Sequence, residues 1–241
     1  MPTPPRIPDG LRRVFADAFR VADIAEPLAS FDEAAPAAEA ARLMAAEGYD
    51  AVGIRRGGRV WGFAEAPLPA DGPCGAAAVR GLAAGPRVFV TAFGGVAGIV
   101  TRADLLKAPV RMWLFGLVTL IELRYTRLIA EAYPDGGWTR LLSAGRVAKA
   151  EELLAERRKR RQELTLLDCL QLADKRDVIV RDDALRAETI FGTKREAEDG
   201  IKMLEGLRNS LAHSQDIVAS DWDAIVRLTD HLDRVLNGGT P

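Results

Sequence analysis

Histidine, cysteine and aromatic side chains are scarce in this sequence of 241 residues. It contains two histidines and two cysteines, and aromatic residues make up 6% of the chain. Because Cys74 and Cys169 lie far apart and lack metal-ligand spacing, they predict a reduced cytoplasmic protein rather than a disulfide scaffold. The two histidines give no histidine–carboxylate cluster, which argues against a catalytic metal centre and predicts that any catalysis needs no metal cofactor.

The sequence also lacks an excess of charge of either sign and a long apolar segment. Its formal net charge is −1, so any attraction for an anion must be local. The longest uncharged apolar run, Met112–Ile121, is about half of the ~20 residues that a membrane span needs. The proline-rich start "MPTPPRIPDG" has no apolar core and does not resemble a signal peptide. We therefore predict a cytoplasmic protein with no membrane partner.

A change of composition divides the chain near Ala108. Residues up to that point are rich in alanine, glycine and proline with short β-like runs, whereas those after it are rich in leucine and charge with helical spacing. Such a shift usually marks a domain boundary. We predict an N-terminal extension over 1–19, an α+β domain over 20–108 and an all-α domain over 109–241.

The predicted α+β domain contains an internal repeat. The segments 51–63 and 87–99 align at an offset of 36, and each alternates apolar residues around a glycine turn, as a β-hairpin does. An alanine-rich segment, 31–49, precedes the first copy and is expected to form a helix ending at Gly48. A shorter helical segment, 74–85, precedes the second. The pattern predicts helix, hairpin, helix, hairpin.

Residues 20–108 resemble a tandem pair of CBS domains, on the segments "VADIAEPLASFDEAAPAAEAARLMAAEGYDAVGIRRGGRVWGF" and "GVAGIVTRADLL". The resemblance implies an adenine nucleotide (AMP, ADP or ATP) bound between the repeats. It also implies that a threonine and an aspartate three residues later contact phosphate and ribose. These positions are Thr101 and Asp104; in the first repeat the same offset gives Glu65 and Leu68, so one nucleotide site is expected. A Thr-x-x-Asp sequence is also a capping box that starts a helix without any ligand, and both interpretations stay open.

From Pro109 onward, the spacing of apolar residues predicts a bundle of five or six helices with short connections. The expected helices cover 110–133, 138–162, 164–180, 183–191, 193–213 and 221–236. In the fifth, Ile201, Leu204, Leu207 and Leu211 form a core-facing stripe. Asn209 and His213 lie four residues apart on a face opposite that stripe, which favours a solvated or functional histidine over a core histidine.

The segment "RNSLAH", late in a long helix of an all-α domain, resembles the HEPN-domain signature. The resemblance implies a metal-independent endoribonuclease in which two copies of the motif meet across a homodimer. RNA supplies its own nucleophile, the 2′-hydroxyl. Arg208 would bind phosphate oxygens, Asn209 would orient the imidazole or bind phosphate, and His213 would transfer protons. A single histidine per chain gives a physical reason to expect two chains at one site.

The densest basic run, Arg157, Arg158, Lys159, Arg160 and Arg161, is a candidate guide for the RNA backbone, although such runs are usually just solvated helix faces. The leading hypothesis is therefore a homodimeric endoribonuclease regulated by an adenine nucleotide. The alternative is a non-catalytic nucleotide-sensing protein whose helical half serves in dimerisation.

Overall fold

The computed structural model describes residues 13–14, 18–49, 51–61, 68–69, 75–189 and 191–230. The chain forms two compact units, one within Pro8–Trp113 and one within Leu114–Pro241. The division falls inside helix α4 (Ala108–Ala132), a few residues after the change in composition. Each unit is described separately below.

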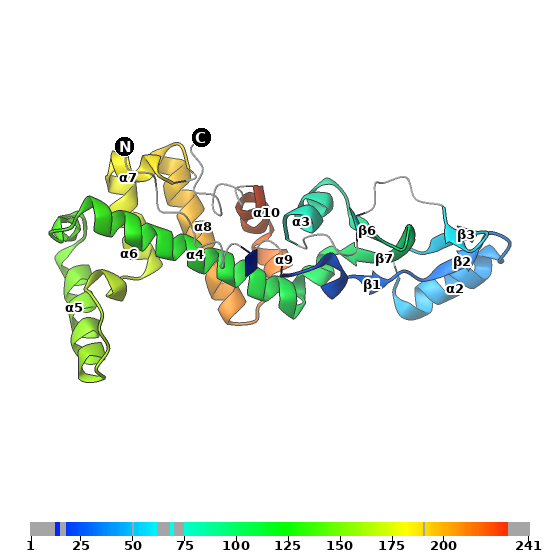
Figure 1. Ribbon diagram of the computed structural model, residues 1–241, viewed down its shortest axis with the longest axis horizontal. Coiled ribbons are helices and arrows are strands. Elements are labelled where there is room, and N and C mark those ends of the chain that lie inside the picture. The colour runs from blue at the N-terminus through cyan, green and yellow to red at the C-terminus, as the bar shows by residue number, and fades with distance from the viewer. Residues whose placement is uncertain are drawn as a thin grey trace. The chain divides into compact units, whose positions relative to one another are not determined.

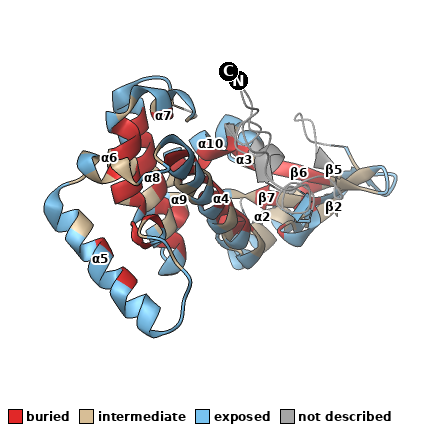
Figure 2. Cartoon of the chain, turned by 60° about the vertical axis from the view of Figure 1, so that its left-hand side comes forward, coloured by how far each residue is buried: buried red, intermediate tan, exposed pale blue. Residues whose placement is uncertain are grey.

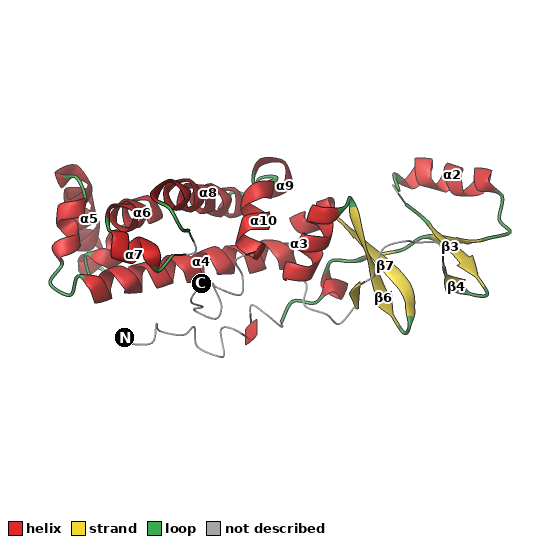
Figure 3. Cartoon of the chain, turned by 90° about the horizontal axis from the view of Figure 1, so that it is seen from above, coloured by secondary structure: helices red, strands yellow, loops and turns green. Residues whose placement is uncertain are grey.

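The N-terminal unit repeats one strand–helix–strand–strand topology, and Figures 1 and 3 show the helix and the last two strands of each copy. The first copy comprises β2 (Ser30–Asp32), α2 (Ala37–Glu47), β3 (Gly53–Arg56) and β4 (Arg59–Val60). The second comprises β5 (Leu68–Pro69), α3 (Gly75–Ala84), β6 (Arg87–Ala92) and β7 (Gly95–Thr101). In both copies the first strand pairs in parallel with the second, and the last two strands form an antiparallel hairpin.

A further short strand joins the second sheet. Strand β1 (Glu26–Pro27) pairs antiparallel with β7, giving the orders β1-β7-β6-β5 and β2-β3-β4. A Cβ at Gly98 would lie 3.0 Å from the carbonyl oxygen of Glu26, so glycine allows β1 to approach β7 at this point. Two 3₁₀ helices flank the sheets, η1 (Val21–Asp23) and η2 (Arg102–Leu106).

The predicted order of helix, hairpin, helix, hairpin is confirmed. Helix α2 ends at Gly48, whose φ of 69° lies in the left-handed region and whose N–H donates to the carbonyl of Met44. Strands β2 and β5, which precede each helix, were not anticipated, because each has only two or three residues and no alternating apolar pattern. Gly62, Phe63 and Cys74, included in the predicted elements, lie outside the described residues.

The second hairpin carries the core of this unit. Val88, Phe89 and Val90 of β6 and Val100 of β7 are buried, together with Val79 and Leu82 of α3. Val88, Val90 and Val100, which pairs with Val88, lie on one face of the sheet, and Phe89 lies on the other. Both faces therefore bury apolar side chains, and this burial provides hydrophobic stabilisation of the unit.

The C-terminal unit is helical. The part of α4 beyond Trp113 belongs to it and is followed by α5 (Ala144–Lys159), α6 (Leu172–Arg181), α7 (Asp183–Ala187), α8 (Lys194–Ala212), α9 (Ile217–Ser220) and α10 (Trp222–Asp230). Two 3₁₀ helices, η3 (Gly137–Leu141) and η4 (Leu167–Cys169), lie between them. The prediction of an α+β half followed by helices is confirmed at this level of detail.

Two of the predicted helices are broken in the structure. The segment 138–162 is divided between η3 and α5, with Ser143 as the N-cap of α5. The segment 164–180 is divided between η4 and α6, with Gln171 as the N-cap of α6. Each break lies at a leucine in extended conformation, Leu142 or Leu170. Because these leucines fit the apolar spacing of a helix, the sequence pattern does not reveal the interruption.

Helix α8 buries the stripe that its spacing predicts. Ile201, Leu204, Leu207 and Leu211 are all buried, and α6 packs against this helix. In Figure 2, α6 is largely red, whereas α5 is mostly exposed. In the part of the chain that the structure describes, no helix combines the length and the apolar character that crossing a membrane requires.

Candidate functional sites

The predicted catalytic motif lies at the C-terminal end of α8. The helix begins with a capping box, in which Thr193 and Glu196 bond to each other's backbone N–H, and it ends at His213, the C-cap residue. The N–H of His213 donates to the carbonyl of Asn209 at 3.0 Å, and both side chains are exposed. The structure therefore places these two polar groups away from the buried leucine stripe.

Arg208 and Asn209 are in direct contact. The Nη2 atom of Arg208 lies 3.3 Å from Oδ1 of Asn209, and its Nη1 atom lies 3.5 Å from Oε2 of Glu122 on α4. The Arg208 side chain keeps 32% of its surface exposed, so the side chain is only partly enclosed by its neighbours. No side-chain hydrogen bond or ion pair between described residues joins the imidazole of His213 to Arg208 or Asn209. The structure thus brings together two of the three predicted residues.

Glu122 and Lys175 extend this site, and the sequence did not identify their role. Lys175 of α6 donates to Oε1 of Glu122 at 2.9 Å, and its side chain is only 6% exposed. Glu122 thus lies between a buried ammonium and the guanidinium of Arg208. The charged pair Asp174–Lys175 is visible in the sequence, but its spacing gives no reason to place it here, because no spacing rule connects residues on three different helices.

The second predicted site, at Thr101 and Asp104, lies at a cavity of about 460 Å³ in the N-terminal unit. The cavity is lined by residues of β1 and the segment after it, the end of α2, the start of β6, the end of β7 and the start of η2. They are Glu26, Pro27, Leu28, Ala29, Gly48, Tyr49, Ala51, Pro86, Arg87, Ile99, Thr101, Ala103 and Asp104. The counterpart position Glu65 in the first repeat lies outside the described residues.

Asp104 also caps η2, as the structural interpretation of this motif predicts. Its Oδ2 accepts hydrogen bonds from the N–H of Thr101 at 2.7 Å and from the Thr101 hydroxyl at 3.0 Å. The aspartate side chain is only 7% exposed. Asp104 therefore caps η2 and also lines the cavity.

Lys107 compensates the charge of Asp104. Its Nζ lies 2.9 Å from Oδ1 of Asp104, forms an ion pair with Glu26 and donates to the carbonyl of Ile24 at 2.7 Å. Burial lowers the pKa of Lys107, but hydrogen bonds and charge from Glu26 and Asp104 outweigh burial and raise the pKa above 10.5. Lys107 therefore stays charged and ties β1 to η2 at one side of the cavity.

The five residues of the basic run are all exposed at the end of α5. Lys159 and Arg160 pair with Glu156 at 3.7 and 3.2 Å, and Arg157 contacts the Gln162 amide at 3.4 Å. The guanidinium groups of Arg158 and Arg161 have no hydrogen-bonded or ionic partner among the described residues. Cations at a helix C-terminus are also favoured by the helix dipole, so this run has a structural role without any ligand.

The described residues contain no group of three or more histidine, cysteine, aspartate or glutamate side chains arranged to hold a metal ion. Comparison of the chain with protein-family models, with curated proteins and with solved structures found no match. The resemblances to CBS and HEPN domains therefore rest on the quoted motifs, and the functions that they imply remain predictions.

Proposed function

We propose that the chain is a cytoplasmic protein that senses an adenine nucleotide through the cavity at Thr101 and Asp104. One observation carries this proposal: a cavity of about 460 Å³ lies at the two residues that the sequence motif singled out. The volume falls within the range of about 300–1,000 Å³ that is typical of small-molecule sites. The repeated strand–helix–strand–strand topology gives further support, because the motif follows the last strand of the second copy.

The hydrogen-bonding capacity of Asp104 allows a ligand as well as a cap. An ionised carboxylate has about four acceptor positions, and the bonds from Thr101 and the contact with Lys107 occupy three of them. One acceptor position remains for a ribose hydroxyl. The Thr101 hydroxyl donates to Asp104 and accepts from the backbone N–H of Asp104 in the capping box, so one lone pair remains for a donor on the ligand.

Titration calorimetry with AMP, ADP and ATP tests this proposal, and the chain supplies a matched control. Thr165 and Asp168 form the same capping box in the helical unit, with bonds of 2.8 and 2.7 Å to Asp168. Asp104→Asn should weaken binding by about tenfold or more, because a hydrogen bond to a charged group contributes roughly 1.5–3 kcal/mol. Asp168→Asn should leave binding unchanged. Absence of binding to the unmodified protein, or equal effects of the two substitutions, would contradict the proposal.

A second function, metal-independent RNA cleavage by a homodimer, is favoured by the contact between Arg208 and Asn209 on an exposed helix end. In this mechanism the 2′-hydroxyl attacks the adjacent phosphorus and the 5′-oxygen leaves, giving a 2′,3′-cyclic phosphate and a 5′-hydroxyl. Arg208 stabilises the charge on the phosphate oxygens, and His213 of each chain exchanges a proton with the nucleophile or the leaving group. The basic run Arg157–Arg161 would attract the RNA backbone.

Cleavage is tested with single-stranded RNA in EDTA, using His213→Ala, Arg208→Ala and, as the control, His231→Ala, which removes the chain's other histidine. Loss of a general acid or base slows a reaction by about 10²–10⁴-fold, so His213→Ala should be nearly inactive and His231→Ala active. If the unmodified protein is inert on many RNAs with and without nucleotides, the ribonuclease proposal fails. Nucleotide binding without cleavage would then favour a non-catalytic regulatory protein.

A further inference from the structure

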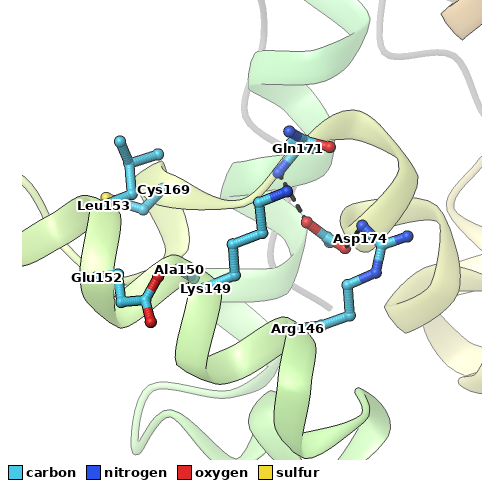
Figure 4. A pocket seen from close by; sticks show the side chains of 8 residues that line it. All are labelled: Arg146, Lys149, Ala150, Glu152, Leu153, Cys169, Gln171 and Asp174. Atoms are coloured by element: carbon cyan, nitrogen blue, oxygen red, sulfur yellow. Dashed lines mark hydrogen bonds and ion pairs between the residues drawn. The ribbon is translucent and has the colours of Figure 1, made fainter.

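The helical unit contains a cavity of its own, which neither predicted site includes. It has a volume of about 380 Å³ and lies between α5 and the segment that runs from η4 into α6 (Figure 4). Its walls are formed by Arg146, Lys149, Ala150, Glu152, Leu153, Cys169, Gln171 and Asp174. Cys169 of η4 and Gln171, the N-cap residue of α6, line the cavity on either side of the helix break at Leu170.

Two cations stand on one side of the cavity. Arg146 forms an ion pair with Oδ1 of Asp174 at 3.1 Å, yet its side chain keeps 47% of its surface exposed. Lys149 is exposed and has no hydrogen-bonded or ionic partner among the described residues. Figure 4 shows both side chains extending from α5 toward the start of α6, whereas Glu152 points to the side away from Asp174. An anionic group would therefore meet Lys149 first.

Apolar side chains also line the cavity, with a polar edge beside them. Ala150 and Leu153 come from α5 and Cys169 from η4; Ala150 and Cys169 are buried, and Leu153 is 39% exposed. The Gln171 amide lies at the rim and offers both a donor and an acceptor. Asp174, which also accepts from the N–H of Gln171 at 3.1 Å, offers further acceptor capacity to a donor on a ligand.

We propose that this cavity binds one nucleotide unit. The phosphate group lies against Lys149 and Arg146, the base covers Ala150, Leu153 and Cys169, and the edge of the base bonds to Gln171 and Asp174. The volume is near the lower end of the range for small-molecule sites, which suits one nucleotide rather than two. Because the wall carries two cations and two carboxylates, a single phosphate is favoured over a triphosphate chain.

The nucleotide unit has two sources, a free mononucleotide or one residue of an RNA strand. Helical spacing places Arg157 on the same face of α5 as Arg146 and Lys149, since these positions follow one another at intervals of three and eight residues. Arg160, the C-cap residue of α5, follows three residues later. Neighbouring phosphates of a bound strand would therefore meet further cations. Binding here requires neither the cavity of the N-terminal unit nor RNA cleavage.

Alkylation of Cys169 reports occupancy of the cavity, because this residue lines the cavity and, at 6% exposure, reacts only when the wall opens locally. Tryptic cleavage separates Cys169, in 162–175, from Cys74, in 60–80, so mass spectrometry follows alkylation of each cysteine in the unmodified protein. The probes are AMP, GMP, CMP and UMP, and a short single-stranded 2′-O-methyl oligonucleotide, which lacks the nucleophile for cleavage. A probe at about ten times its Kd should slow alkylation of Cys169 roughly tenfold.

Lys149→Met keeps most of the aliphatic stem and removes the charge, so it should abolish protection at the same probe concentration. Lys202→Met, which removes an exposed lysine of α8 outside the cavity, is the control and should retain protection. Protection of Cys169 by mononucleotides would identify the ligand as a free mononucleotide. Protection by the oligonucleotide alone would identify it as one residue of an RNA strand. Absence of protection by every probe, or full protection in Lys149→Met, would overturn the proposal, whatever the outcome for RNA cleavage.

Discussion

At the scale of single residues, Glu122 connects the ionic groups at the end of α8 to the interior of the helical unit. One of its oxygens holds the Lys175 ammonium, which is 6% exposed, and the other faces Arg208. A buried cation that loses its counter-ion keeps its desolvation cost without compensation. The carboxylate therefore has two separable roles, to neutralise Lys175 and to hold Arg208.

We predict that Glu122→Gln lowers the free energy of unfolding by about 3 kcal/mol, because it leaves Lys175 buried and unpaired. Adding Lys175→Met should recover most of this loss, since replacement of both partners removes the buried charge. Urea denaturation of the two variants gives the comparison. If Glu122→Gln is as stable as the unmodified protein, the ion pair between Glu122 and Lys175 contributes nothing to the free energy of unfolding. If the double variant remains as unstable as the single one, the loss has another cause.

The pair of Tyr133 and Asp182 gives a prediction about pH. The Tyr133 hydroxyl donates to Asp182 and lowers the pKa of that carboxyl below its ordinary 3.8, while the same bond raises the pKa of Tyr133 above 10.0. Asp182 also accepts from the N–H groups of Ala184 and Leu185, so removing the tyrosine hydroxyl leaves the cap of α7 intact.

Tyr133→Phe should therefore reduce the free energy of unfolding by about 1 kcal/mol near neutral pH. Asp182 contributes to the free energy of unfolding above the pKa that it has in the unfolded chain, and this contribution is lost as pH falls through its lower pKa in the folded protein. Tyr133 contributes below the pKa that it has in the unfolded chain, and its contribution is lost as pH rises through its higher pKa in the folded protein. Denaturation at a series of pH values should show the difference between the proteins shrinking at both ends. A difference that is constant below pH 3.8 would exclude this bond as its source.

At the scale of elements, two glycines of α8 offer a matched comparison. Alanine at an ordinary helix position is about 1 kcal/mol more favourable than glycine. A Cβ at Gly200 would lie 2.1 Å from the ring of Phe191, whereas a Cβ at Gly206 would have only Asp221 nearby, at 3.7 Å. At Gly200, but not at Gly206, packing therefore opposes the gain in helix propensity that alanine would bring.

Gly200→Ala should destabilise the protein by about 1 kcal/mol, because overpacking costs roughly 1–3 kcal/mol and exceeds the gain in propensity. Gly206→Ala should stabilise it by about 0.5–1 kcal/mol. Thermal unfolding of both variants provides the measurement. Stabilisation by both substitutions would mean that the Phe191 ring moves aside without cost, and the packing argument would be wrong.

Periodicity predicted the long elements and failed at the short ones. The stripe of α8 and the two hairpins carry repeated apolar positions, and the structure confirms them. Strands β2 and β5 are held by parallel pairing with residues more than twenty positions away, which no local pattern shows. The break at Leu170 was equally hidden, because an apolar residue at a helical interval looks the same in a helix and at its interruption.

The candidate sites were predictable only where their residues are close together in the sequence. Thr101 and Asp104 lie three residues apart, and Arg208, Asn209 and His213 lie within one or two turns, so a local motif identified them. Glu122 and Lys175 come from helices that are distant along the chain and meet Arg208 only through tertiary packing. The cavity beside α5 depends on where a helix stops, which the sequence does not mark.

At the scale of the whole molecule, regulation of the helical unit by a nucleotide would require a difference in affinity between two states. A nucleotide that binds monomer and dimer equally shifts nothing, however tightly it binds. If the proposed dimer is the state that the nucleotide controls, the two equilibria are linked and reciprocal: the factor by which the nucleotide changes the dimerisation constant equals the factor by which dimerisation changes nucleotide affinity.

We predict that both factors are equal and at least about fivefold, which is the lower limit of typical allosteric coupling. Sedimentation velocity with and without AMP gives the first factor. Calorimetric titration of AMP into the protein below and above its dimerisation constant gives the second. The Asp104→Asn variant should show neither effect, because it loses the ligand, whereas Asp168→Asn should show both. If AMP binds tightly and both factors equal one, the N-terminal unit binds the nucleotide but does not regulate dimerisation. A ligand without differential affinity cannot change the population of the dimer.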